Sequence, residues 1–260
     1  MFSVLDMFTI GVGPSSSHTV GPMCAAQAFA SSLEESGAVS RVGRIRVVLY
    51  GSLSLTGLGH GTDRAILAGL EGNVPATVDT DYLLSVRERC AHDGTIHVNG
   101  TNAIAYDDDG DMVFDRWKRL APHPNGMRFQ AFDAQGNIID EQVWYSIGGG
   151  FIRRGRIDDA LISNHEQTPA SSQSPEDSGN DEAAEYGDGV PYPFVSCDGL
   201  IDLCRKHHLS IADVVWANET ARRSPQEVRD RLTRIWNVMS HCIDCLLYTS
   251  PSPRDYAASR

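Results

Sequence analysis

Apolar side chains recur at helical spacing in three stretches of the first hundred residues. Small and apolar residues from Cys24 to Leu33 keep this spacing until Gly37 supplies a stop, which predicts a helix entered through a polar loop at Ser15 to Thr19. The stretch from Gly59 to Gly72 opens with Thr62 and Asp63, repeats the apolar pattern and ends at glycine, so it predicts a helix that is capped at its start. A third helix is expected from about Asp79 to Ala91.

Alternating apolar and polar positions predict strands between and after these helices. Arg44 to Gly51 alternates as a half-buried strand does, and Gln135-Gly136 lies between two longer alternating runs that predict a hairpin. The predicted strands are 44–51, 95–98, 103–106, 127–134 and 137–147. Such a mixture favours an α+β layer with a mainly antiparallel sheet.

The pattern changes after the first ~150 residues. Residues 155–189 are rich in Ser and Pro, with six acidic residues between Glu176 and Asp188, which is typical of a linker. Helical spacing returns in 196–208, 211–223 and 226–245, where Ser210, Ser224 and Pro225 suit helix starts. We therefore expect a first domain over 1–154, an acidic flexible linker over 155–189 and the incomplete start of an all-helical domain over 190–245.

Charge and composition exclude several classes of function. The chain has 34 acidic and 22 basic residues and a net charge of -12, which disfavours nucleic acid and anionic membranes as partners. The N-terminus lacks a basic region before an apolar core, and no stretch reaches the length of a membrane span. We expect a cytoplasmic protein.

Cysteine and lysine usage supports that compartment and narrows the chemistry. The six cysteines follow no disulfide framework, which suits a reducing environment. Lys118 and Lys206 are the only lysines, and neither lies in a cofactor motif, so a pyridoxal phosphate enzyme is not expected. Cys242 and Cys245 resemble half of a zinc or redox motif but have no second pair at the required spacing.

Two glycine-flanked turns carry the candidate chemistry. Ser15, Ser16, Ser17, His18 and Thr19 precede a helix, where free N–H groups, hydroxyls and an imidazole suit a carboxylate or phosphate. A Ser/Thr helix cap without a ligand explains the same residues equally well.

The second turn follows a strand and enters the helix at Thr62 and Asp63. It carries His60 between glycines, where a ligand can approach closely. A surface histidine is the simpler explanation taken alone. Two such turns make a shared pocket for a small acid and a proton shuttle more credible.

Two further segments frame the predicted hairpin. Asn125-Gly126 is a common turn signal, and Ser146 precedes a run of three glycines that suits a domain exit. Both therefore serve as ordinary turns unless other information links them to a site.

Five blocks together resemble the single-chain, iron-sulfur L-serine dehydratases of bacteria, in their N-terminal portion. The blocks are SSSHTVGPM, YGSLSLTGLGHGTDRAILAGL, NGMRFQ, YSIGGGF and VPYPF, in the same order, and the likeness covers about 2–244. The resemblance implies an allosteric-substrate-binding-like α+β domain, a linker and a helical catalytic domain around a [4Fe–4S] cluster. It also implies conversion of L-serine to pyruvate and ammonia, and a homodimer for the full-length protein.

The resemblance assigns roles to residues of both turns. Ser15 to Thr19 and His60 to Asp63 become parts of the serine pocket, with Ser16, Ser17 and His18 holding the carboxylate. His60 and Thr62 face the reacting centre, and Asn125 and Ser146 lie on the same rim. His18 and His60 are both candidates for the catalytic base, and the sequence does not choose between them.

The likeness ends before the family's cluster-binding cysteines, and none of the six cysteines present matches them. No metal ligand is therefore expected in this chain. The segment 246–260 departs from the family pattern and is similar to adapter read-through, so we expect a non-native tail, a longer natural product and an inactive isolated chain. A free-standing amino-acid sensor and the separate beta subunit of a two-chain dehydratase are the alternatives. A Ser-His hydrolase is disfavoured because G-x-S-x-G is absent.

Overall fold

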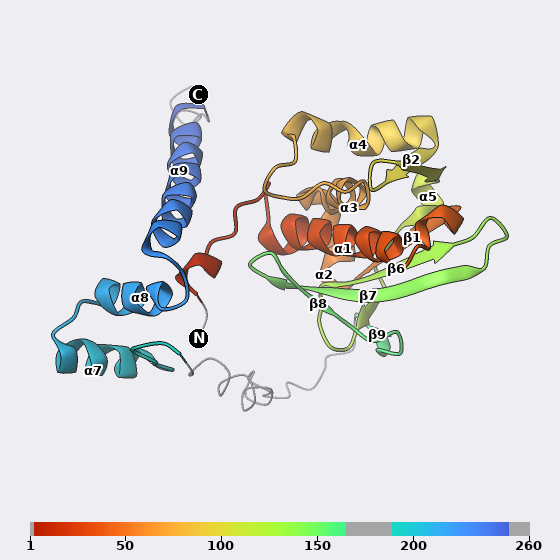
Figure 1. Cartoon of the computed structure of the whole chain (residues 1–260). Coiled ribbons are helices and arrows are strands. Elements are labelled where there is room, and N and C mark those ends of the chain that lie inside the picture. Colours follow the sequence, from red (N-terminus) through yellow and green to blue (C-terminus); the bar gives the residue numbers. More distant parts are fainter. Residues whose placement is uncertain (1–2, 165–188, 250–260) are drawn as a thin grey trace, which may run out of the picture. The chain divides into compact units, whose positions relative to one another are not determined.

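The computed structural model describes residues 3–164 and 189–249 (Figure 1). The chain forms two compact units, one of residues 11–169 and one of residues 1–10 together with 170–260. Residues 250–260 of the expected tail and most of the expected linker lie outside the described residues, while residues 246–249 of that tail are the end of a helix.

A seven-stranded sheet forms the centre of the first unit, in the order β2-β3-β1-β6-β7-β8 with β4 also beside β1. Its strands are β1 (Arg44–Tyr50), β2 (Thr95–Val98), β3 (Asn102–Ala105), β4 (Met112–Asp115), β6 (Gly126–Phe132), β7 (Ile138–Gly148) and β8 (Phe151–Arg154). The pairs β2–β3, β1–β6, β6–β7 and β7–β8 are antiparallel. The predicted antiparallel-rich sheet and the hairpin are confirmed, whereas the parallel pairing of β1 with β3 and β4 was not expected.

The three long helices of the first unit lie where the apolar spacing predicts them, whereas its two short helices were not predicted. They are α1 (Gly21–Glu35), α3 (Thr62–Leu70) and α4 (Thr80–Asp93), with the shorter α2 (Ser52–Thr56) and α5 (Asp108–Asp111). Helix α1 buries Phe29 against Phe129 of β6, with ring centroids 5.2 Å apart. Burial of one such side chain stabilises the fold by about 1.5–3 kcal/mol.

Close contact between α1 and α3 fixes how these two helices lie on each other. A Cβ at Gly69 of α3 would lie 2.3 Å from the carbonyl oxygen of Met23 in α1. Only glycine allows the helices to approach this closely. Since α1 and α3 follow the two histidine-bearing turns in the chain, their packing also sets where those turns meet.

The other face of the sheet carries a second, smaller core. Strand β1 alternates as predicted from Arg44 to Val47, but its second half is buried on both faces. There Val48 and Tyr50 pack with Leu120, Val143 and Tyr145. A two-stranded ribbon of β5 (Lys118–Leu120) and β9 (Leu161–Ser163) contributes Leu120 to this core. Strand β9 lies within the segment 155–189 that the sequence predicts as a linker.

The second unit contains the helices α7 (Cys197–His207), α8 (Ile211–Thr220) and α9 (Pro225–Thr249), as predicted. Ser210 caps α8 in a capping box with Asp213, and the Ser224 hydroxyl accepts a hydrogen bond from the Glu227 N–H. The turn Val4–Asp6 belongs to this unit, although the sequence predicts a first domain that begins at residue 1. None of the described helices combines the length and apolarity that crossing a membrane requires.

Candidate active site

The His18 turn is a π-helical segment, Ser16–Val20, that runs directly into α1. The sequence predicts a polar loop here, but Pro22 has no N–H, so α-helical bonding to the His18 carbonyl cannot form. The wider π-helical turn accommodates this gap. The Ser15 hydroxyl caps the turn by accepting a hydrogen bond from the His18 N–H, at 3.2 Å.

The side chain of His18 is held at both ring nitrogens. Its Nδ1 lies 2.8 Å from the Ser17 hydroxyl, and its Nε2 lies 3.1 Å from the Ser52 hydroxyl on α2. Burial lowers the pKa of His18, the charge of His60 lowers it further, and a hydrogen bond with Ser52 acts in the opposite direction. The lowered pKa favours the neutral imidazole, in which one nitrogen donates and the other accepts.

The His60 turn is a 3-10 segment, Gly57–His60, that follows α2 and precedes α3. Gly61 has a φ of 64° and begins α3 without a side-chain cap, which corrects the prediction that the start of this helix is capped. The reason is that Thr62 and Asp63 bond to other segments. The His60 Nδ1 donates to the Thr56 carbonyl at 2.9 Å, so Nε2 is the basic nitrogen of the neutral ring.

The two imidazoles lie side by side, with ring centroids 4.9 Å apart and planes inclined by 41°. Within the described residues, His60 Nε2 has no hydrogen-bond partner, whereas both nitrogens of His18 are bonded. The arrangement can therefore accept a proton at one ring and orient a ligand with the other.

Two threonines connect the turns. The Thr19 hydroxyl donates to the His60 carbonyl at 2.9 Å, and the Thr62 hydroxyl donates to the His18 carbonyl at 2.5 Å. Both threonines are buried.

Asp63 lies at the start of α3 but is only 4% exposed. Its Oδ2 accepts from Arg87 of α4 at 2.5 Å, and Arg87 also bonds Asp108 at 2.8 Å. Asp63 Oδ1 is buried without a partner among the described residues. The carboxylate is thus bound to Arg87 of α4, although the family resemblance places it in the serine pocket.

Asn125 and Ser146 bond to each other rather than remaining open. The Ser146 N–H donates to the Asn125 carbonyl, and the Asn125 amide donates to the Ser146 carbonyl, both at 3.1 Å. Ser146 is fully buried against the first residue of α1, since a Cβ at Gly21 would lie 2.1 Å from its hydroxyl oxygen. Ser146 therefore packs directly behind the His18 turn.

Ser52 and Thr56 are site residues that the sequence did not single out. Both lie on α2, which the alternating letters SLSLT hide because they have the period of a strand. The available signal was Gly51, whose φ of 58° ends β1 and starts the helix. The Ser52 N–H also donates to the Pro124 carbonyl, which brings the Asn125 loop to the same place.

The described residues show no metal centre. Across residues 3–164 and 189–249, no group of three or more His, Cys, Asp or Glu side chains lies close enough to hold an ion. Cys90 is buried, while Cys242 and Cys245 are exposed thiols on α9. These residues do not fit an iron-sulfur cluster.

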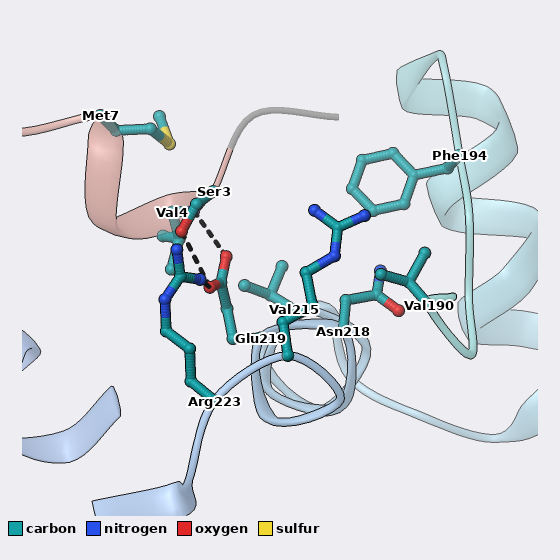
Figure 2. Close-up of a pocket in the computed structure, with 10 residues that line it drawn as sticks. Ser3, Val4, Met7, Val190, Phe194, Val215, Asn218, Glu219 and Arg223 are labelled. Atoms are coloured by element: carbon teal, nitrogen blue, oxygen red, sulfur yellow. Dashed lines mark hydrogen bonds and ion pairs between the residues drawn. The ribbon is translucent and has the colours of Figure 1, made fainter. Parts of the chain in front are cut away.

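The second unit has a mainly apolar hollow of about 280 Å³ (Figure 2). Glu219 at its wall accepts hydrogen bonds from the Ser3 hydroxyl and the Val4 N–H, and it pairs with Arg223. The hollow is lined by Ser3, Val4, Met7, Val190, Phe194, Val215, Asn218, Glu219, Arg222 and Arg223. The N-terminal segment thus builds part of this unit, and none of the predicted site residues lies here.

Comparison with known proteins identifies relatives of nearly the whole chain. The family model described as serine dehydratase beta chain matches residues 3–156. An L-serine dehydratase of Streptomyces coelicolor is 41% identical over 93% of this chain and 49% of its own length. L-serine dehydratase 1 of Escherichia coli is 38% identical over 94% of this chain and 49% of its own. The chain thus spans about half the length of the curated relatives it matches.

Proposed function

The chain belongs to the serine dehydratase beta chain family, and from this premise we propose that it supplies the histidine-bearing part of an L-serine dehydratase. The reaction converts L-serine to pyruvate and ammonia. The relatives named L-serine dehydratase, 34–41% identical to nearly the whole chain, support the assignment.

The chemistry requires a base and an orienting site. A base removes the α-proton of serine, and the β-hydroxyl leaves as water, which forms aminoacrylate. Its imine tautomer then takes up one water to release pyruvate and ammonia, so the atoms balance with no oxidant or reductant. Serine's α-proton is weakly acidic, so the base must lie close to it.

We assign the base to His60. The observation that carries this choice is the hydrogen bond from His60 Nδ1 to the Thr56 carbonyl. This bond holds the ring proton on Nδ1 and leaves the Nε2 lone pair to accept the α-proton of serine. His18 is held by Ser17 and Ser52 and so suits orientation of the substrate. The exposed Ser16 and half-buried Ser15 and Ser17 offer hydroxyls for the substrate carboxylate.

Elimination also needs a Lewis acid on the departing hydroxyl, which the [4Fe–4S] cluster implied by the resemblance would supply. Because the described residues do not fit that cluster, we assign its ligands to the part of the relatives that this chain does not cover. The complete enzyme is proposed to be a cytoplasmic homodimer, and the free thiols Cys24 and Cys90 are consistent with a reducing compartment.

The test joins residues 1–244 in frame to the uncovered half of the Streptomyces coelicolor relative, with expression and iron-sulfide loading under anaerobic conditions. We expect pyruvate and ammonia in equal amounts from L-serine. A fusion that folds and binds iron but releases no pyruvate would contradict the proposal. Tight binding of L-serine to the 260-residue chain alone, measured by calorimetry, together with an inactive fusion, would favour an amino-acid sensor.

A further inference from the structure

Two buried threonine hydroxyls are each bonded to the backbone of the opposite histidine. Thr19 is 1% exposed and Thr62 is 0% exposed. Thr19 donates to His60, 41 residues away, while Thr62 donates to His18, 44 residues away. The two bonds are reciprocal, because each threonine is next to or near one histidine in sequence and bonds the other.

The carbonyl groups that accept these bonds lie where regular helix bonding changes. Pro22 is four residues after His18 and has no N–H to donate to its carbonyl. Gly61 is in the left-handed region directly after His60, so the chain turns there before α3 begins. Gly57 leaves room for the Thr62 hydroxyl, since a Cβ at Gly57 would lie 2.9 Å from that oxygen.

We propose that Thr19 and Thr62 are positioning residues, whose paired hydroxyl bonds set the spacing of the His18 and His60 rings. The proposal rests on the proposed function and reassigns two residues that the sequence placed in contact with substrate. The spacing that the bonds maintain is the 4.9 Å between ring centroids.

The hydroxyl chemistry supports positioning over substrate contact. A threonine hydroxyl has one proton to donate, and each of these protons is already directed at a carbonyl. Thr19 also accepts from the Ser15 N–H at 3.3 Å. A substrate group would have to break an existing buried bond, whereas the exposed Ser16 hydroxyl can bind without that loss.

The first test measures the spacing in the 260-residue chain and does not depend on activity. Nuclear Overhauser contacts between the His18 and His60 ring protons are recorded with labelled histidine. Thr19→Val and Thr62→Val are expected to weaken the contact, while Thr19→Ser and Thr62→Ser, which keep the hydroxyl, retain it. Thr220→Val is the matched control because it removes a similar hydroxyl-to-carbonyl bond within α8.

The second test uses the active fusion and separates positioning from binding. If the threonines position the base, each valine variant lowers kcat on the order of 10²-fold with KM nearly unchanged, and serine at the same position restores kcat. An unchanged ring contact in both valine variants overturns the proposal, and so does a raised KM with unaltered kcat. Loss of all activity in the unsubstituted fusion would contradict the proposed function and leave the ring-contact test to decide this inference.

Discussion

The His18 turn and the His60 turn meet at one place, but different forces hold them there. Behind the His18 turn, the Cα of Gly21 packs on the buried Ser146 side chain, an uncharged contact that depends on shape. Behind the His60 turn, Asp63 is anchored through Arg87 to Asp108, a contact that depends on charge. Shape and charge respond to different perturbations, so the two anchors can be separated by experiment.

The charged anchor reaches across three elements. Arg87 of α4 bridges Asp63 at the start of α3 and Asp108 at the start of α5, and Tyr106 donates its hydroxyl to Asp108. Hydrogen bonds from Arg87 and then from Tyr106 hold the pKa of Asp108 below its usual range against the opposing effect of burial. The first turn of α3 therefore depends on residues outside the histidine site.

The largest difference between the turns is expected in catalysis. His60→Asn removes the nitrogen assigned as base, and we expect a loss of about 10²–10⁴-fold in kcat of the active fusion. His18→Asn keeps a group that can donate a hydrogen bond, so we expect a smaller loss, expressed more in KM. Steady-state kinetics with L-serine measure both, and equal losses of kcat in the two variants would remove the distinction between base and orienting group.

The next largest effect is expected on stability, when the charged anchor loses Arg87. Arg87→Met leaves the buried Asp63 carboxylate without its cation, which should lower the free energy of unfolding by about 3 kcal/mol. This change in the free energy of unfolding can be measured by urea unfolding, followed through the nuclear magnetic resonance amide signals of α3. Arg156→Met is the control, because its pair with Asp158 is exposed and worth little. Equal stability of the two variants would show that the anchor does not hold α3.

Disrupting the uncharged contact between Gly21 and Ser146 should cost less stability than removing Arg87. Gly21→Ala introduces a Cβ that must lie 2.1 Å from the Ser146 hydroxyl oxygen, so strand and helix must separate, at a cost of about 1–3 kcal/mol. Gly59→Ala on the other turn is the control, since its Cβ meets no atom within 4 Å. Adding Ser146→Gly should recover part of the loss. If the loss of unfolding free energy in the double variant equals the sum of the losses in the two single variants, Gly21 and Ser146 are not in direct contact.

Local patterns in the sequence predicted the long elements, because their periodicity depends only on neighbouring residues. Helices α1, α3 and α4 and the β6–β7 hairpin belong to this group. Strands β4, β5, β8 and β9 have only three or four residues each, and β4 and β5 exist through partners far away in sequence. Strands β2 and β3 are equally short but were predicted, and they pair with each other. A short pattern therefore fails mainly where the partner strand is distant in sequence.

The site shows the same limit at the level of single side chains. The motifs marked both histidines, because glycine-flanked turns before helices are visible in sequence. The sequence does not show where each side chain points, so Thr62 and Asp63 were assigned to the substrate. In the structure, Thr62 bonds the His18 carbonyl and Asp63 bonds Arg87. Pro22 was the one local sign that the His18 carbonyl needed a donor from another segment.

The smallest expected effect is the pH dependence of stability that His18 of one turn and Asp108 of the charged anchor contribute. The folded pKa values of His18 and Asp108 are both lowered, so each group stabilises the fold above its unfolded pKa, and that stability is lost as the pH falls through the folded value. The loss begins below about pH 6.5 for His18 and below about pH 3.9 for Asp108. His18→Asn should therefore flatten the decline in unfolding free energy between pH 7 and pH 5 and leave the decline below pH 4 intact. His123, whose pKa burial also lowers, contributes equally to both proteins and cancels in the comparison. An identical decline from pH 7 to pH 5 in both proteins would show that His18 is no harder to protonate in the folded chain than in the unfolded one.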